Sequence, residues 1–157
     1  MSETAMQEFW VARDVDRLGE HLGRGIARVF FKVATTDSHG SLVVIEMTHH
    51  AKGGPARHLH YEQDEWFYVV EGEYVFEIGQ ERIRLKPGDS VFGPRQVPHV
   101  WAFVGDAPGR ILFVFTPACQ MEAFFRAPLN ADARPPQDPA YYRRYGMELV
   151  GPPLAIE

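Results

Sequence analysis

The sequence has little of what disulfide-stabilised, secreted and membrane proteins need. Its single cysteine, Cys119, cannot form an internal disulfide, a shortage typical of proteins from reducing compartments. The longest apolar run, Ile111 to Phe115, is far too short to span a bilayer. Charged residues interrupt positions 1–20, so these positions hold no apolar core of a signal peptide. We therefore expect a cytoplasmic protein with no membrane partner.

The sequence also lacks a long basic block. Its formal net charge is -5, which argues against nucleic acid as the main partner. Hydrophobic residues make up 45% of the chain, so most of it is expected to fold. At 157 residues the chain has the size of one domain with a single ordinary core.

What the sequence does contain is a series of short strand patterns. Runs rich in β-branched and aromatic residues alternate with turns rich in glycine and proline, at a spacing typical of an antiparallel sandwich or barrel. No helix-length segment interrupts residues 27–115, which excludes the alternating pattern of a parallel sheet with crossover helices. The expected strands are 28–34, 41–48, 65–70, 74–78, 81–85, 90–92, 99–104 and 110–115. The sequence therefore predicts an all-β fold.

Both ends of the chain differ from this central region. Residues 1–26 show no strand period and are predicted to form an N-terminal arm, followed by a barrel over residues 27–117. Residues 118–157 are predicted to pack on the barrel as part of the same domain. They begin with a short helix over 119–126, continue through a loop rich in proline over 127–140, and end in an extended tail.

Histidines and one glutamate form the chemically most informative pattern. His58 and His60 are two residues apart in an extended segment, so both side chains point to the same side. Glu65 follows closely, and His99 lies in a later strand. Neutral imidazoles and a carboxylate suit one divalent transition metal such as Fe, Ni, Mn, Zn or Cu. If His99 comes from a facing strand, the four side chains converge on a mononuclear site inside the barrel.

The spacing of these residues matches a known motif. His58 and His60 are followed by four residues, Glu65, six residues and Gly72, which fits the first motif of the cupin family. The glycine that usually precedes the first histidine does not fit, because Gly54 leaves a shorter loop than the pattern.

A second motif follows in order. Gly88, Pro94 and His99 match the second cupin motif in register. Gln96 stands where that motif usually has glycine, and Phe103 stands where it usually has asparagine. Neither departure removes a metal ligand.

The chain thus resembles the cupins, and in particular single-domain bacterial cupins of the quercetin 2,3-dioxygenase-like group. The resemblance implies a double-stranded β-helix, or jelly-roll barrel, with a metal held by His58, His60, Glu65 and His99. It also implies a catalytic role for Glu65, which would accept a proton from a substrate hydroxyl. That role requires a carboxylate pKa raised by partial burial.

Alternation along the strands identifies candidate residues for a substrate pocket. Residues two positions apart in a strand face the same side. Phe67 should therefore point inward like Glu65, and Trp101 and Phe103 should point inward like His99. Such aromatic residues either line a ligand pocket or simply fill a small barrel. Arg57, next to His58, either guides an anionic substrate at the rim or is a solvated loop residue.

Three functions remain open at this stage. The first is a dioxygenase-like oxidoreductase that acts on a small aromatic or enolic compound. The second is a Lewis-acid isomerase or lyase of a sugar or carbonyl acid. The third is a non-enzymatic protein that binds a small molecule. In each case a homodimer is expected, because the N-terminal arm and the exposed sheet edges are common places for strand exchange.

Overall fold

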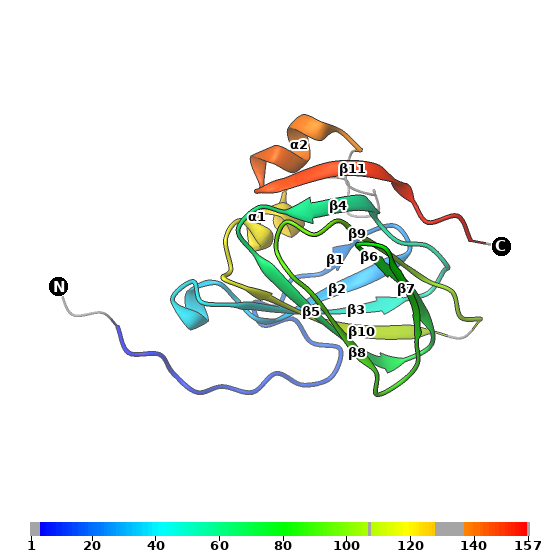
Figure 1. Cartoon of the computed structure of the whole chain (residues 1–157). Coiled ribbons are helices and arrows are strands. Elements are labelled where there is room, and N and C mark those ends of the chain that lie inside the picture. Colours follow the sequence, from blue (N-terminus) through cyan, green and yellow to red (C-terminus); the bar gives the residue numbers. More distant parts are fainter. Residues whose placement is uncertain (1–3, 107, 128–136, 157) are drawn as a thin grey trace.

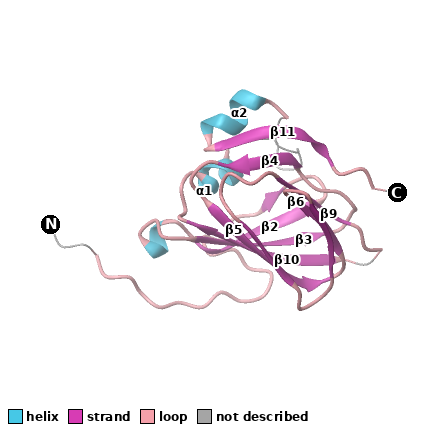
Figure 2. Cartoon of the chain, viewed as in Figure 1, coloured by secondary structure: helices cyan, strands magenta, loops and turns pink. Residues whose placement is uncertain are grey.

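Two antiparallel β-sheets form the body of the protein (Figures 1 and 2). The computed structural model describes residues 4–106, 108–127 and 137–156. In hydrogen-bonding order, the six-stranded sheet contains β1 (Leu22–Gly23), β2 (Ala27–Val33), β3 (Val43–His49), β10 (Gly109–Thr116), β5 (Asp64–Glu71) and β8 (Ser90–Gly93). The five-stranded sheet contains β11 (Met147–Pro153), β4 (Ala56–His60), β9 (His99–Phe103), β6 (Tyr74–Ile78) and β7 (Glu81–Leu85). The predicted all-β fold is confirmed.

The core lies between the two sheets. Every second residue of β3, from Val43 to His49, is buried, as expected when one face of a strand packs on the core. Phe67 in the first sheet and Trp101 and Phe103 in the second are also buried, so the predicted inward direction of these three side chains is confirmed. Aromatic rings meet across the interior, as in the contact between Phe67 and Phe76 at 4.8 Å between ring centroids.

Helical segments are few and short. A 3-10 turn (Thr36–Ser38) follows β2, and the helices α1 (Met121–Arg126) and α2 (Pro139–Arg144) lie near β4 and β11 (Figure 1). The Asp138 side chain caps α2 by accepting a hydrogen bond from the Ala140 amide at 3.0 Å. The predicted helix over 119–126 is confirmed as α1. The predicted loop over 127–140 falls largely outside the described residues. None of the helices in the described part is long and apolar enough to cross a membrane.

The C-terminal tail is extended, as predicted, and belongs to the five-stranded sheet. It forms strand β11, which pairs with β4 so that Met147 lies opposite His60 and Leu149 opposite His58. Proline and glycine near the end of this segment weaken a strand pattern in the sequence. An edge strand tolerates them, because one of its sides needs no ladder of hydrogen bonds. The tail thereby covers the strand that carries two of the four candidate ligands.

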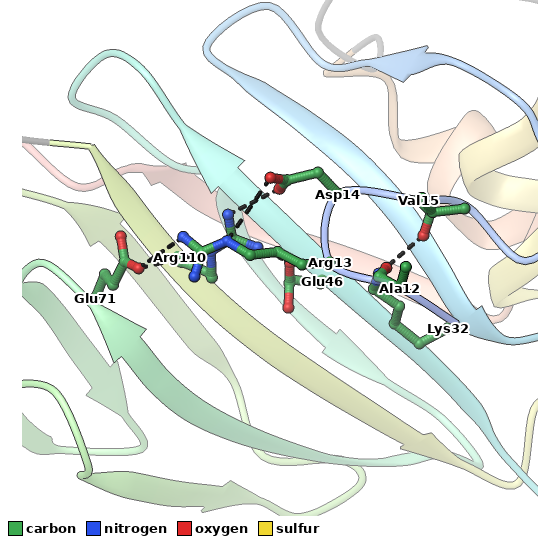
Figure 3. A network of polar contacts seen from close by, with 8 residues as sticks. All are labelled: Ala12, Arg13, Asp14, Val15, Lys32, Glu46, Glu71 and Arg110. Carbon is green, nitrogen blue, oxygen red and sulfur yellow. Dashed lines mark hydrogen bonds and ion pairs between the residues drawn. The ribbon is translucent and has the colours of Figure 1, made fainter. Parts of the chain in front are cut away.

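Part of the N-terminal arm is fixed to the outer face of the six-stranded sheet (Figure 3). Arg110 on β10 forms ion pairs with Asp14 of the arm and with Glu46 of β3. The Lys32 ammonium donates to two backbone carbonyls of the arm, at 3.0 and 2.8 Å. The buried Asp16 carboxylate accepts a hydrogen bond from the Phe31 amide at 2.7 Å. These contacts hold the arm from about residue 12 onward, whereas residues 4–10 are exposed.

Candidate metal centre

Four side chains from three strands meet inside the molecule. His58 and His60 extend from β4, His99 from the neighbouring strand β9, and Glu65 from β5 of the opposite sheet. His58 and His99 lie directly opposite each other in the ladder between β4 and β9. One ligand atom from each residue lies within 4.8 Å of those of the others, and all four residues are buried. The convergence predicted from the sequence is present in the structure.

Backbone carbonyls orient two of the imidazoles. The Nδ1 atom of His58 lies 2.7 Å from the Ala56 carbonyl oxygen, and Nδ1 of His99 lies 3.3 Å from that of Val97. A carbonyl only accepts hydrogen bonds, so each Nδ1 carries a proton, and in the neutral imidazole the lone pair is therefore on Nε2. The His60 ring stacks on the His99 ring with centroids 5.4 Å apart. This is the tautomer and support that metal-binding histidines need.

The centre of the cluster holds polar atoms without partners. His60 Nε2, His99 Nε2 and Glu65 Oε2 are buried and make no hydrogen bond among the residues that the structure describes. The glutamate oxygen lies 3.2 Å from the His60 nitrogen and 3.1 Å from the His99 nitrogen. Leaving such atoms unpaired costs about 1–3 kcal/mol each. A divalent transition metal would satisfy them together, so this donor set fits the metal that the sequence predicts.

Protonation at the cluster also suits a metal. Burial raises the pKa of Glu65, but contacts with His60 and His99 lower it by more, and the resulting pKa is about 2. Burial lowers the pKa of His58 well below its ordinary value, and the nearby His99 and His60 lower it further. A charged carboxylate and a neutral imidazole are the forms that bind metals. The raised pKa that we expected for Glu65 is therefore wrong, because the expectation considered burial without the neighbouring imidazoles.

The segment that contains the strands of the cluster matches a known protein family. Residues 43–115 match the family model described as the cupin domain. The match covers a little under half of the chain. All four converging residues lie within the matched part, which supports the resemblance drawn from the two motifs.

The proteins that this chain is similar to are diverse. The tetracenomycin polyketide synthase protein TcmJ of Streptomyces glaucescens is 30% identical over 60 residues, which are 38% of this chain and 40% of that protein. The chain spans less than half the length of the curated relatives it matches. Among solved structures, the nucleoside dehydratase Pac13 of Streptomyces has a TM-score of 0.59 at 13% identity, with 94% of each chain covered. A predicted oxalate decarboxylase of Thermotoga maritima has a TM-score of 0.60 at 16% identity, covering 70% of this chain and 99% of that one. These structures share the fold of this chain and differ in their named activities.

A cavity of about 110 Å³ reaches the candidate metal centre. Its lining is mainly apolar, as is typical of a small-molecule site. It includes His58, His60 and Glu65 of the cluster and, of the predicted pocket residues, Trp101. Its large apolar lining residues include Met47, Phe113, Phe115, Met121, Phe124, Phe125 and Met147.

Three predicted pocket residues lie elsewhere. Phe67 and Phe103 are buried core residues that do not belong to the cavity lining. Arg57 points away from the cavity and forms an ion pair with Glu77 at 3.3 Å. None of these three residues belongs to the described lining, so the pocket roles expected for them stay predictions that this lining does not support.

Four polar residues that the sequence analysis did not single out also line the cavity: Arg24, His49, Gln137 and Tyr142. His49 ends β3, is buried, and has its Nδ1 atom 2.8 Å from the Tyr74 hydroxyl oxygen. The alternation of buried residues along β3 was a usable signal for His49. Arg24 and Tyr142 follow no motif, and only the folded chain brings them to this wall.

The low pKa of His49 predicts that the folded protein loses part of its free energy of unfolding in acid. Burial lowers the pKa of His49 to about 3, with His50 as a smaller cause. Below the ordinary value of 6.5, the unfolded chain binds a proton here that the folded chain does not bind. The contribution of neutral His49 to the free energy of unfolding is therefore fully present above about pH 6.5 and is lost as the pH falls toward 3. At pH 5 the loss is about 2 kcal/mol.

Urea unfolding at about pH 7.5 and pH 5 measures this effect. Between the two pH values, the free energy of unfolding of His49→Gln is expected to fall by about 2 kcal/mol less than that of the wild type. The matched control is His50→Gln, because His50 is exposed and adjacent in sequence. It should lose as much as the wild type. An unchanged acid loss in His49→Gln would contradict the assignment.

Proposed function

We propose that this cupin is a metal-dependent, dioxygenase-like oxidoreductase that acts on a small aromatic or enolic compound. One observation carries the proposal: His60, His99 and Glu65 direct buried, unpaired ligand atoms at one another beside a cavity. We infer that these residues and His58 hold one divalent transition metal. Three histidines and one carboxylate leave coordination positions open, and a bound metal would supply redox or Lewis-acid chemistry there.

The cavity walls favour an aromatic or enolic substrate. Phe113, Phe115 and Phe125 provide an apolar surface that would bind a flat ring and exclude water. Burial raises the pKa of the Tyr142 hydroxyl to about 12, so it stays protonated and able to donate a hydrogen bond to a substrate oxygen. His49 is neutral near pH 7, and its imidazole offers a second polar contact at the same wall.

Two likenesses support this substrate class. The quercetin 2,3-dioxygenase-like group, which the two motifs resemble, takes its name from the oxidation of an aromatic enol. TcmJ is named as a protein of a polyketide synthase, and polyketides are rich in enols and aromatic rings. With its low pKa, Glu65 would serve this chemistry first as a charged ligand rather than as a strong base.

A second candidate is a Lewis-acid isomerase or lyase of a sugar or carbonyl acid. It is favoured by the structural likeness to a nucleoside dehydratase and to a predicted oxalate decarboxylase, neither of which is named as an oxygenase. The same four residues would hold the metal, and the polar groups of the cavity would move protons. The apolar lining fits an aromatic or carbonyl compound better than a sugar.

Oxygen consumption tests the first function against the second. Protein loaded with Fe or Ni is expected to consume O2 with at least one of a set of flavonols, diketones and catechols. The His99→Ala variant under the same conditions should consume none above the background. Turnover that continues without O2 and with Mn or Zn would favour the Lewis-acid enzyme. Tight binding of one of these compounds without formation of any product would indicate a non-enzymatic protein that binds a small molecule.

We also propose a homodimer formed through the N-terminal arm. Beyond the tether shown in Figure 3, the arm exposes Met6, Phe9 and Trp10, and Trp10 is 85% exposed. Apolar side chains on an extended segment are well placed to bind a second copy, as in arm exchange. Sedimentation velocity should give twice the chain mass of 17.9 kDa. Trp10→Ser should shift the species toward monomer, whereas His21→Ser should not. A monomeric wild type at high concentration would contradict the dimer.

A further inference from the structure

A buried arginine lies in the wall of the cavity that holds the candidate metal ligands. Arg24 directly follows β1, is only 7% exposed, and lines the cavity together with His58 and Glu65. Its Nη1 atom donates to the Gly23 carbonyl at 2.7 Å. Its Nε and Nη2 atoms are buried and have no hydrogen-bond partner within the described ranges. Most of the hydrogen-bonding capacity of this guanidinium is therefore unused.

The two unused atoms form the edge with which a guanidinium binds a carboxylate. A side-on pair of hydrogen bonds from Nε and Nη2 matches the spacing of the two carboxylate oxygens. The protein itself shows this geometry three times, with N–O distances between 2.8 and 3.1 Å: Arg17 with Asp37, Arg95 with Asp64, and Arg143 with Glu148. Arg24 presents the same edge, and no carboxylate of residues 4–106, 108–127 or 137–156 is hydrogen-bonded to it.

The described part of the cavity lining offers Arg24 no counter-charge. Among its described lining residues, Glu65 is the only carboxylate, and its Oε2 atom faces His60 and His99. The Arg24 guanidinium carbon lies 5.6 Å from the centroid of the Phe125 ring. Burial lowers the pKa of Arg24, yet an arginine side chain keeps its charge. A buried charge without a partner is unfavourable, and an anionic ligand would relieve it.

We propose that the substrate of this site carries a carboxylate that Arg24 binds through Nε and Nη2. The inference rests on the proposed function, because the same substrate must present its reacting end to the four-residue cluster. The walls between the two ends are apolar, as Phe113, Phe115 and Phe124 show. The substrate class is therefore a small aromatic or enolic carboxylic acid. Arg24 binds and positions it and takes no part in bond making.

Benzoate and benzamide form a matched pair of probes, since they share ring and shape and differ in charge. Their affinities are measured by isothermal titration calorimetry on the full chain, both loaded with Zn and free of metal. Wild type is expected to bind benzoate about 10- to 100-fold more tightly than benzamide in both forms. Arg24→Gln should bind the two probes equally, and Arg24→Lys should keep part of the preference. The control Arg57→Gln should match the wild type, because Arg57 lies outside the cavity.

Each other outcome overturns the inference. No binding of benzoate by the wild type, equal binding of both probes, or an undiminished preference in Arg24→Gln would do so. Thermal unfolding separates a structural role. Arg24→Gln should melt no lower than the wild type, because it removes a charge that a ligand, not the protein, neutralises. The proposed function fails by a different measurement, namely a wild type that binds no metal, and that result leaves the benzoate preference of the metal-free protein intact.

Discussion

His99→Ala is expected to lose the metal that the wild-type protein retains on purification. The mutation removes one of four converging ligands and leaves Glu65 Oε2 with a single imidazole nitrogen nearby. Loss of residues that only support metal ligands already lowers affinity about 10- to 100-fold, so loss of a ligand should lower it by about 100-fold or more. Elemental analysis and titration with Zn or Mn measure the metal content and the dissociation constant.

The matched control is His50→Ala, which removes an exposed histidine outside the cluster. It should retain the wild-type metal content. Circular dichroism should show the same β signal for both variants, since the sheets do not depend on His99 for their ladders. Full metal content in His99→Ala would mean that the metal binds somewhere other than at these four residues.

Gly54→Ala should produce the largest loss of stability that a single added methyl group causes in this protein. A Cβ atom at position 54 would lie 1.9 Å from the Trp101 carbonyl oxygen and 3.0 Å from the Ala102 Cα atom. These are backbone atoms of β9 and cannot rotate away. The strand that carries His99 would have to move, which we expect to lower the free energy of unfolding by about 3–5 kcal/mol. Urea or thermal unfolding measures the change.

Gly88→Ala is the matched control for Gly54→Ala. Gly88 has a φ of +92°, and a Cβ atom there would meet no atom within 4 Å. It should therefore show only the strain of the left-handed backbone, about 1–2 kcal/mol. A loss in Gly54→Ala no greater than in Gly88→Ala would contradict the close approach of the Gly54 loop to β9. This approach also explains why a glycine is needed here although its distance from His58 departs from the usual cupin motif.

The sequence was sufficient to predict the cluster because its members obey simple rules. His58 and His60 share a side by the two-residue period of a strand. Glu65 and His99 sit at motif positions, and the structure brings all four together. The same period also places Arg57, between two inward residues, on the outer face, where it pairs with Glu77. Strict use of alternation would therefore have excluded Arg57 from the pocket.

The remaining features of the site depend on distances along and between strands. The alternation of inward and outward residues does not specify these distances. Alternation predicted that Phe67 and Phe103 point inward, but not that they lie in the core while Trp101 reaches the cavity. The low pKa of Glu65 follows from two imidazoles contributed by other strands. Arg24 and Tyr142 come from segments at opposite ends of the chain, one beside a two-residue strand and one in a short helix. Neither segment has a pattern that reveals its partner.

Anomalous X-ray diffraction from crystals of protein purified without added metal tests the central claim most directly. Data collected on both sides of the absorption edge of the metal found by elemental analysis should give one peak per chain. That peak should lie about 2.0–2.2 Å from the Nε2 atoms of His58, His60 and His99 and from a carboxylate oxygen of Glu65. No peak at this cluster after soaking with Fe, Mn, Ni, Cu and Zn, or a peak bound by other residues, would contradict a metal centre in this protein.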